Sequence, residues 1–318
     1  MKTFLGIEIG GTKLQLVAGD EKMHISERRK LGVEPAAGAD GIRRQIEQAI
    51  RELGAEWKFD AVGIGFGGPV NWREGKIACS HQIGGWSDFE ICRWAEQLTD
   101  APVVVDNDAN VAALGEAMHG AGRKFNPVFY VTLGSGVGGG LILDGNIYHG
   151  VPPGELEIGH IRMDRVGTIL ESRCSGWSVN ARVRELAKTA PESQLARLAE
   201  GAAGHEAKCL GTALRQGDPL AQRLLAEVAN DLAFGLSHAV HLLHPEVILL
   251  GGGLAGIGES LRFQVAEELQ PFLMKVFQPG PQVLLASLGE DAVPIGALEL
   301  ARRKSSGRTD RPATLHDL

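Results

Sequence analysis

"IEIGGTK", residues Ile7–Lys13, follows a short apolar run and contains two adjacent glycines, and its conformation decides the fold. A glycine pair behind a strand is typical of phosphate binding, but several unrelated folds use it. The next residues, LQLVAGD, continue with the alternation of a strand and end in a Gly-Asp turn. The sequence therefore predicts a β-hairpin with glycines at its turn.

Three functional interpretations of this turn compete. A dinucleotide-binding fingerprint needs G-x-G-x-x-G at the start of a helix, whereas a strand follows here. A P-loop needs G-x-x-x-x-G-K-[ST]; Gly6 and Gly11 have the required separation, but Thr12 precedes Lys13, which is the reverse order. The third interpretation is a hairpin whose amides and Thr12 hydroxyl bind phosphate oxygens, with Glu8 facing a magnesium ion. An ordinary turn without a ligand is the alternative.

The same pattern of strand, glycine turn and strand occurs again in VTLGSGVGGGLI, which begins at Val131. A third strand is followed by three glycines in VILLGGGLA, which begins at Val247. The two hairpins start more than a hundred residues apart, which excludes a short solenoid repeat and predicts two similar α/β lobes that face each other across a cleft. The matching turns and the third glycine run favour a nucleotide triphosphate over an ordinary turn.

The predicted boundary between the lobes falls near residues 118–126. Apolar residues at helical spacing predict a helix over 40–53, and a long apolar helix is expected from about 219 to 244, where Pro245 ends it. The expected parts are an N-terminal α/β lobe over 1–120 completed by a C-terminal helix over 291–303, a C-terminal α/β lobe over 121–290, and a loose polar tail over 304–318.

The composition narrows the class of protein. The chain has 318 residues and 44% hydrophobic residues, which is enough for two domains with a sizeable core. Its 43 glycines are roughly twice the average share of about 7%. A net charge of −7 argues against a nucleic-acid surface, and the sequence predicts neither a signal peptide nor a membrane span. We therefore expect a cytoplasmic protein whose four separated cysteines are free buried thiols.

A polar corner stands between a buried strand and a helix in VVVDNDANVAAL, which places Asp106, Asn107 and Asp108 together. Helix capping explains one such residue but not three. In α/β folds ligands bind where strands end, and a carboxylate there could accept a proton from an attacking hydroxyl, a role worth about 10²–10⁴-fold in rate. The N-terminus of the helix would favour the ionised form of that carboxylate.

Together these motifs resemble the sugar kinases of the ROK family, within the actin-like ATPase superfamily, over about residues 3–302. IEIGGTK and VTLGSGVGGGLI look like the two phosphate motifs of the family, and VILLGGGLA looks like its adenosine motif. VDNDANVAALGE is similar to the segment with the catalytic aspartate, and GELEIGHIRMD contains the Glu-x-Gly-His sugar motif. GIGFGGPVN and Trp86 resemble segments near the sugar site. The resemblance implies two ribonuclease-H-like lobes with a central cleft.

The resemblance also implies roles for individual residues. Asp108 is the expected catalytic base. The expected sugar-binding residues are Gly68, Asn107, Asp108, Glu157, His160 and Glu171. The residues expected to bind ATP are Gly10, Gly11, Thr12, Lys13, Gly134, Ser135, Gly136, Gly252 and Gly253. Glu8 is expected to face Mg²⁺ through water; it stands where the family usually has Asp, which is one methylene shorter.

A second departure from the family concerns zinc. The family's segment C-x-C-G-x-x-G-C is absent, and no cysteine lies between His160 and Glu171. Because Cys174 alone cannot form a tetrahedral site, we expect no structural zinc. A backbone carbonyl or a side chain from residues 161–175 is then expected to bond the second ring nitrogen of His160.

The predicted function is the ATP-dependent phosphorylation of a hexose at a primary hydroxyl, with glucose as first choice. Fructose, N-acetylmannosamine, N-acetylglucosamine and allose remain open, as does polyphosphate as a donor. The alternative from another class is a non-catalytic sugar sensor. The family's repressors carry a DNA-binding domain ahead of the sugar-binding part, and with the first phosphate motif at residue 7 we expect no nucleic-acid partner. The resemblance implies a homodimer and no membrane partner.

Overall fold

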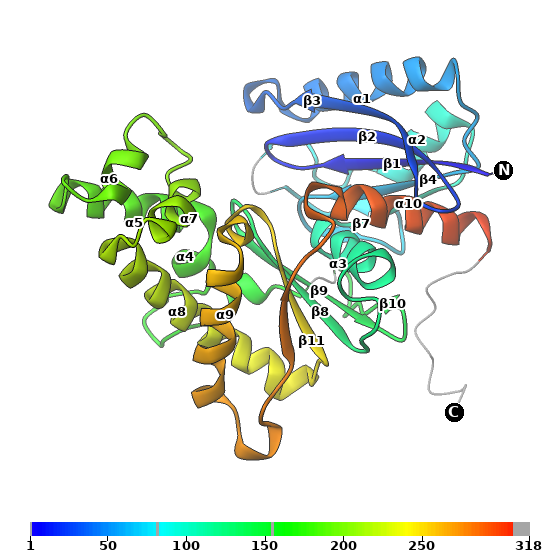
Figure 1. The fold of residues 1–318 in the computed structure, drawn as a ribbon. Coiled ribbons are helices and arrows are strands. Elements are labelled where there is room, and N and C mark those ends of the chain that lie inside the picture. Colours follow the sequence, from blue (N-terminus) through cyan, green and yellow to red (C-terminus); the bar gives the residue numbers. More distant parts are fainter. Residues whose placement is uncertain (1, 81–82, 154–155, 308–318) are drawn as a thin grey trace. The chain divides into compact units, whose positions relative to one another are not determined.

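The computed structural model describes residues 2–80, 83–153 and 156–307, and the chain divides into two compact units (Figure 1). The first consists of Met1–Arg123, Gly140–Leu156 and Glu290–Leu318, and the second of Lys124–Gly139 and Glu157–Gly289. The predicted lobes 1–120 and 121–290 differ from these units mainly in residues 140–156. This segment groups with the first unit because Gly140 lies so close to Ala113 that a Cβ atom on Gly140 would be 2.7 Å from the Cβ of Ala113.

The sheet of the first unit has the order β3-β2-β1-β4-β7. Its strands are β1 (Thr3–Ile9), β2 (Lys13–Asp20), β3 (Ile25–Gly32), β4 (Ala61–Phe66) and β7 (Val103–Asn107). Strands β1, β4 and β7 are parallel, with Ile9 opposite Phe66 and Phe66 opposite Asn107. The three strands therefore end at the same edge of the sheet, and the residues that follow them lie together there.

Helices cover both faces of this sheet: α1 (Gly38–Gly54), α2 (Ile91–Thr99), α3 (Asp108–His119) and α10 (Ala292–Ser305). Side chains alternate between the faces of a strand, and Ile7 belongs to the same buried cluster as Ile46 of α1. Glycines occupy the other face, where a Cβ atom on Gly63 would lie 1.9 Å from the carbonyl oxygen of Ala297 in α10. Part of the glycine excess therefore serves the close approach of a helix.

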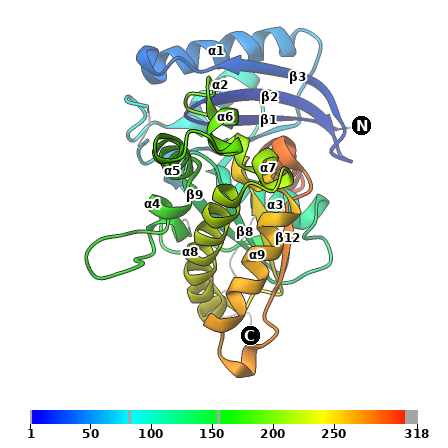
Figure 2. The ribbon, with the colours of Figure 1, turned by 60° about the vertical axis from the view of Figure 1, so that its left-hand side comes forward.

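The second sheet has the order β10-β9-β8-β11-β12, with parallel pairing of β11 to both β8 and β12. Its strands are β8 (Val128–Leu133), β9 (Val137–Leu143), β10 (Asn146–Ile147), β11 (Val247–Gly251) and β12 (Gln282–Leu285). The helices of the second unit are α4 (Glu171–Cys174), α5 (Gly176–Thr189), α6 (Gln194–Ala199), α7 (Ala207–Arg215), α8 (Pro219–Leu243) and α9 (Glu259–Leu269). Helices α8 and α9 lie side by side (Figure 2).

The structure confirms the predicted α/β class, and both glycine turns connect neighbouring strands, β1 to β2, which are antiparallel, and β8 to β9. The predicted helices over 40–53 and 219–244 correspond to α1 and α8. Helix α10 covers the expected helix over 291–303, whereas residues 308–318 of the expected tail lie outside the described residues. Within the described ranges, none of the helices combines the length and apolarity needed to cross a membrane.

Candidate functional site

Asp108 lies at the edge of the first sheet where β1, β4 and β7 end. It is the first residue of α3, directly after β7. A Cβ atom on Gly67, which follows β4, would lie 3.3 Å from Asp108 Oδ2 and 3.4 Å from the Cα of Gly10, which follows β1. The carboxylate that the sequence predicts as a base therefore lies near the first glycine turn.

Asn107 is the N-cap of α3. Its Oδ1 accepts hydrogen bonds from the backbone N–H groups of Ala109 at 2.9 Å and Asn110 at 3.4 Å. Its Nδ2 donates to the carbonyl oxygen of Gly68 at 3.2 Å, and the residue is only 8% exposed. Capping is thus the role that the structure gives to Asn107, and its contact with a sugar stays a prediction.

Asp106, to which the sequence assigned no role, lies in a buried contact beside this corner. Asp106 Oδ2 is 2.6 Å from Nε2 of His149, whose ring stacks on that of Trp72 with centroids 4.2 Å apart. Sequence reasoning missed His149 because no motif marks it and it is 43 residues from Asp106. The sequence marked Asp106 only as one of three adjacent polar residues that capping does not explain.

The first glycine turn is closed by a hydrogen bond from Gly10 N–H to the carbonyl oxygen of Lys13 at 2.8 Å. Within the described chain, no hydrogen bond is found for the N–H groups of Gly11 and Thr12, so these amides can serve a phosphate. Neither Gly10 nor Gly11 has a positive φ, which indicates that the glycines provide room rather than a left-handed backbone. The Glu8 carboxylate accepts a hydrogen bond from Gln15 Nε2, and its Oε2 lies 3.3 Å from Lys13 Nζ.

The second glycine turn is closed by Gly134 N–H, which donates to the carbonyl oxygen of Gly136 at 3.0 Å. Its next residue, Val137, donates its N–H to Glu171 Oε2 at 2.8 Å. The predicted sugar ligand Glu171 therefore supports the turn that is expected to bind phosphate. Ser135 N–H and Gly136 N–H have no hydrogen-bond partner among the described residues, as at the first turn.

Gly136→Ala should lower kcat/KM for ATP by about 10–100-fold. A Cβ atom on Gly136 would lie 2.4 Å from Glu171 Oε2, so the carboxylate must leave its bond to Val137 N–H. A hydrogen bond to a charged group is worth about 1.5–3 kcal/mol, which corresponds to that range. Steady-state kinetics with varied ATP would measure it. Gly256→Ala is the matched control, because a Cβ atom there meets nothing within 4 Å; equal kinetics of the two variants would contradict the assignment.

The glycines after β11 occupy a third close approach. Gly252 has φ +80°, and a Cβ atom on it would lie 2.6 Å from the backbone of Leu133. Gly252 must therefore be glycine for the chain to pass the end of β8. A Cβ atom on Gly253 would meet nothing within 4 Å, which leaves open space at the residue expected to contact adenosine.

The sugar motif packs against Val137, the residue whose N–H donates to Glu171. A Cβ atom on Gly159, between Glu157 and His160, would be 2.2 Å from the carbonyl oxygen of Val137. Glu157 and His160 are both exposed; Glu157 precedes a short 3₁₀ turn, Ile158–His160, and His160 ends it. The predicted sugar residues of the second unit thus lie next to its glycine turn. Trp86, whose segment resembles one near the sugar site, is 1% exposed and packs edge-on against Phe66.

The expectation that residues 161–175 supply a hydrogen bond to the His160 ring is wrong. Among the described residues, none bonds that ring. The loop is instead organised by Asp164, whose Oδ1 accepts hydrogen bonds from three successive backbone N–H groups, those of Val166, Gly167 and Thr168, at 2.8–3.1 Å. The hydrogen bond from the Thr168 side chain and these backbone bonds outweigh the effect of burial and lower the pKa of Asp164.

Metal ligands are sparse in the described part of the chain. No group of three or more His, Cys, Asp and Glu side chains there is placed to hold a metal ion. The four cysteines are free, but of the four only Cys174 is fully buried, and burial raises the pKa of its thiol to about 12. A thiol with such a pKa is a poor source of the thiolate that zinc requires. The absence of a structural zinc stays a prediction.

Asp164→Ala should raise the KM for the sugar several-fold, because the loop between His160 and Glu171 loses the acceptor of three backbone N–H groups. Asp164→Asn keeps a side-chain oxygen, and its KM for the sugar should stay near that of the wild type.

A chelator should leave the melting temperature of the wild-type protein unchanged, and elemental analysis should find no stoichiometric zinc. Bound zinc, or equal KM values for the two variants, would refute the assignment.

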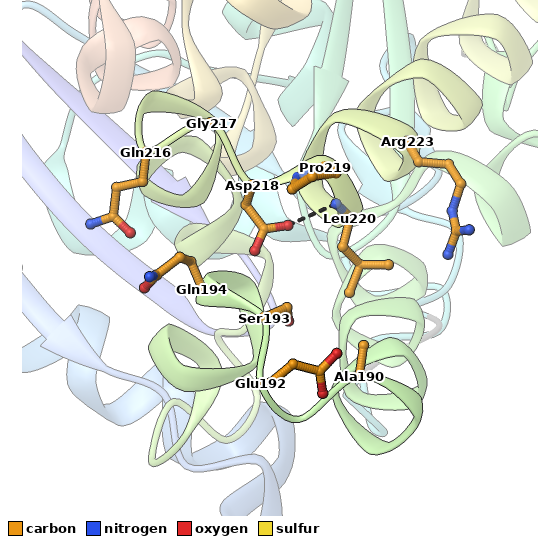
Figure 3. Close-up of a pocket in the computed structure, with 10 residues that line it drawn as sticks. All are labelled: Ala190, Glu192, Ser193, Gln194, Gln216, Gly217, Asp218, Pro219, Leu220 and Arg223. Atoms are coloured by element: carbon orange, nitrogen blue, oxygen red, sulfur yellow. Dashed lines mark hydrogen bonds between the residues drawn. The ribbon is translucent and has the colours of Figure 1, made fainter.

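A cavity of about 670 Å³ lies elsewhere in the second unit (Figure 3). Ten residues line it: Ala190, Glu192, Ser193, Gln194, Gln216, Gly217, Asp218, Pro219, Leu220 and Arg223. None of them is a predicted site residue. Its buried carboxylate, Asp218, is used to cap α8 through Leu220 N–H at 2.7 Å and also accepts Leu195 N–H at 3.0 Å. The cavity is therefore not the candidate site.

Comparisons with known proteins bear on the same residues. The sequence profile of the ROK family matches residues 4–304. Glucokinase of Halalkalibacterium halodurans is 31% identical over 317 residues, which cover 95% of this chain and 96% of that protein. N-acetylmannosamine kinase of Salmonella typhi is 28% identical over 94% of this chain and 98% of that protein. The crystal structure of a ROK family glucokinase from Streptomyces griseus in complex with glucose and AMPPNP has a TM-score of 0.84, with 32% identity over 95% of this chain and 99% of that chain.

Proposed function

Because this chain belongs to the ROK family, as an ATP-dependent sugar kinase, we propose that it phosphorylates glucose at its primary hydroxyl. One arrangement carries the proposal: in each unit a glycine turn lies beside residues expected to handle the sugar. In the first unit Asp108 lies near Gly10, and in the second unit Glu171 bonds directly behind Gly136. A kinase needs both kinds of site, since the phosphoryl group passes from nucleotide to sugar.

In this reaction Asp108 orients the primary hydroxyl of the sugar and accepts its proton as the oxygen attacks the γ-phosphate of ATP. The bond from that oxygen to phosphorus forms while the bond to the leaving ADP oxygen breaks. Phosphoryl transfer asks mainly for positioning and charge stabilisation, which suits a site without a covalent nucleophile. The unbonded amides of Gly11, Thr12, Ser135 and Gly136 would hold phosphate oxygens.

The residues present fit a magnesium ion that arrives with the nucleotide. Mg²⁺ keeps several waters and is usually held by one or two carboxylates together with substrate phosphates. Glu8 is the carboxylate next to the first turn, and Lys13 Nζ lies 3.3 Å from its Oε2. When bound, Mg²⁺ supplies charge neutralisation at the phosphates.

We propose sugar contacts for Asn107 in the first unit and, separately, for Glu157, His160 and Glu171 in the second. The second amide hydrogen of Asn107, beyond the one given to Gly68, is available for a sugar oxygen. Glu157 and His160 are exposed beside Val137, and Glu171 has one carboxylate oxygen on Val137 N–H and a second for a sugar hydroxyl. The choice of glucose is supported by the glucokinases among the relatives, and N-acetylmannosamine is the second candidate because a kinase for that sugar is 28% identical.

An ADP-release assay across a panel of hexoses and N-acetylhexosamines, with ATP and polyphosphate as donors, tests the proposal. We expect the highest kcat/KM with glucose and ATP. A higher value with N-acetylmannosamine would replace the substrate but keep the reaction. Calorimetric sugar binding without turnover on any sugar would refute the kinase and support a sensor.

A further inference from the structure

His149 and Asp106 form a buried pair inside the first unit. Their side chains are 6% and 5% exposed, and His149 Nε2 lies 2.6 Å from Asp106 Oδ2. An ionised carboxylate can only accept, so the imidazole donates this hydrogen bond. The ring of His149 also stacks on Trp72 at an interplanar angle of 21°. The imidazole is thus held by a hydrogen bond at its Nε2 and by an aromatic ring on one face.

Asp106 also forms hydrogen bonds within the strand–helix corner. Its other oxygen, Oδ1, accepts the backbone N–H of Asn107 at 2.8 Å and the side-chain Nδ2 of Asn110 at 3.0 Å. Asn107 is the N-cap of α3, and Asp108 is its first residue. A single carboxylate therefore joins His149 to the peptide that precedes the base and to the first turn of the helix that carries it.

We propose that His149 is a positioning residue, which acts through Asp106 to hold Asp108 in its reactive orientation. The inference rests on the proposed kinase function, because it takes Asp108 as the base. Without His149, Oδ2 of a buried carboxylate would lose its donor, which is costly enough for Asp106 to rotate toward another donor. The bond to Asn107 N–H would then change, and Asp108 would move with the corner.

A displacement of this kind affects the reaction more than the binding of nucleotide. A shift of about 1 Å in a reacting group can cost about 10²-fold in rate. The turn at Gly10–Lys13 is closed by its own hydrogen bond and receives none from His149 or Asp106. Loss of the pair should therefore lower kcat and leave the KM for ATP nearly unchanged.

Two substitutions separate the hydrogen bond from the stacking. His149→Phe keeps an aromatic ring against Trp72 but removes the donor, and should lower kcat by about 10–100-fold with the KM for ATP within about three-fold. His149→Gln keeps a donor without the ring, and should recover most of the lost turnover. His24→Gln is the matched control, since His24 also faces an aspartate, Asp20, at 3.3 Å but is exposed; it should leave kcat unchanged.

The measurements are steady-state kinetics at 25 °C on folded protein, with circular dichroism as a check. A folded His149→Phe protein with wild-type kcat would overturn the proposal, as would equal losses in His149→Phe and His149→Gln. If His149→Phe does not fold, Asp106→Asn decides: it keeps Oδ1 for Asn107 and weakens only the contact with His149. A wild-type kcat in Asp106→Asn would overturn the proposal, and a ten-fold or larger loss at an unchanged KM for ATP would support it.

The proposal can fail separately from the kinase assignment. Nitrogen-15 spectra of the histidines do not need turnover, and the signal that disappears in His149→Gln identifies His149. In the wild type its Nε2–H should be protected from solvent exchange, and Asp106→Asn should shift it. A shifted signal in a protein that is inactive on every sugar would support the His149–Asp106 hydrogen bond but refute the proposed kinase function. An unshifted, rapidly exchanging signal in an active enzyme would refute the pair alone.

Discussion

Replacing Asp108 by Asn should lower kcat by about two orders of magnitude or more and change the KM for the sugar by only a few-fold. Asn keeps the size of the side chain but cannot accept the proton of the attacking hydroxyl. The cap of α3 is Asn107 rather than Asp108, so the substitution removes no capping hydrogen bond and should leave the fold intact. Steady-state kinetics on the folded variant give both numbers.

Asp100→Asn is a suitable control for Asp108→Asn. Asp100 ends α2 with φ 51°, a left-handed conformation that Asn adopts as readily as Asp. Its substitution should leave kcat within two-fold of the wild type. Near-normal turnover of Asp108→Asn would remove Asp108 from the mechanism, while the hairpins and their phosphate interpretation would stand.

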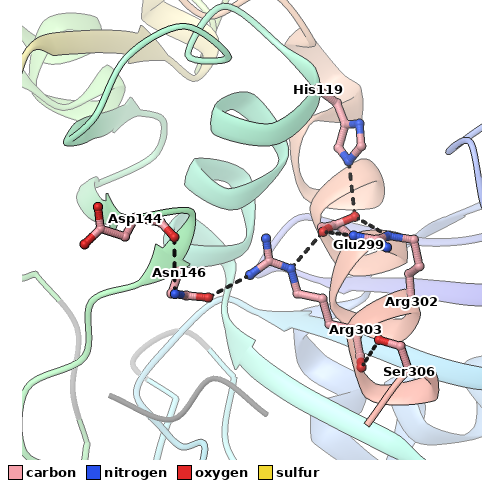
Figure 4. A network of polar contacts seen from close by, with 7 residues as sticks. All are labelled: His119, Asp144, Asn146, Glu299, Arg302, Arg303 and Ser306. Atoms are coloured by element: carbon pink, nitrogen blue, oxygen red, sulfur yellow. Dashed lines mark hydrogen bonds and ion pairs between the residues drawn. The ribbon is translucent and has the colours of Figure 1, made fainter. Parts of the chain in front are cut away.

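Replacing Glu299 by Gln should lower the free energy of unfolding of the first unit by about 3–5 kcal/mol. The side chain of Glu299 is fully buried on α10 and accepts hydrogen bonds from Arg302 at 2.7 and 2.8 Å and from Arg303 at 2.7 Å (Figure 4). His119 on α3 lies 3.3 Å from it. Arg303 is only 3% exposed, so the neutral variant removes the negative charge to which a buried guanidinium donates.

Thermal unfolding measures this loss. For a unit of about 170 residues, each kcal/mol shifts the melting temperature by about 2–4 °C, so a decrease of roughly 6–20 °C is expected. Glu185→Gln is the control, because Glu185 forms an exposed pair with Lys188 and should cost at most about 1 kcal/mol. Equal shifts in the two variants would show that the buried cluster contributes no more than a surface pair.

The same carboxylate sets an acid dependence. Burial alone would raise the pKa of Glu299, but hydrogen bonds from His119, Arg302 and Arg303 outweigh it and hold the pKa well below its ordinary value. The folded-state pKa is therefore lower than the unfolded one. The contribution of Glu299 to the free energy of unfolding is fully present above the ordinary pKa of a glutamate and is lost as the pH falls through the folded-state pKa. The difference in melting temperature between wild type and Glu299→Gln should accordingly shrink as the pH is lowered below about 4.3.

Local patterns predicted the elements of the fold well. The hairpin at Gly10–Gly11 and the helix that Pro245 ends both depend on neighbours in the sequence, and both were predicted. The grouping of residues 140–156 with the first unit was not, because it depends on the close approach of Gly140 to Ala113. The burial of Trp86, whose segment resembles one near the sugar site, likewise depends on tertiary packing.

The candidate site divides in the same way. In each unit one predicted site residue lies near a glycine turn, Asp108 near Gly10 and Glu171 near Gly136, and their roles stay predictions. His149 could not be predicted because its partner Asp106 is distant in the sequence, and a lone histidine carries no periodicity. The hydrogen bond expected between residues 161–175 and the His160 ring is not present among the described residues. Asp164 instead accepts backbone N–H groups of that loop, and a single aspartate in a loop sequence does not predict such bonds.

The place of α10 has a consequence for how the chain matures during synthesis. Most of the first unit is synthesised before the second. Its helix α10, however, packs on β1, β4 and α3, and the absence of a side chain at Gly63 makes room for it. At about 5–20 residues per second, translation needs roughly 15–60 s to reach residue 292. During that interval the glycine face of the first sheet lacks α10, whereas nearly all of the second unit has been made. The second unit can therefore complete its folding on the ribosome before the unit that starts the chain.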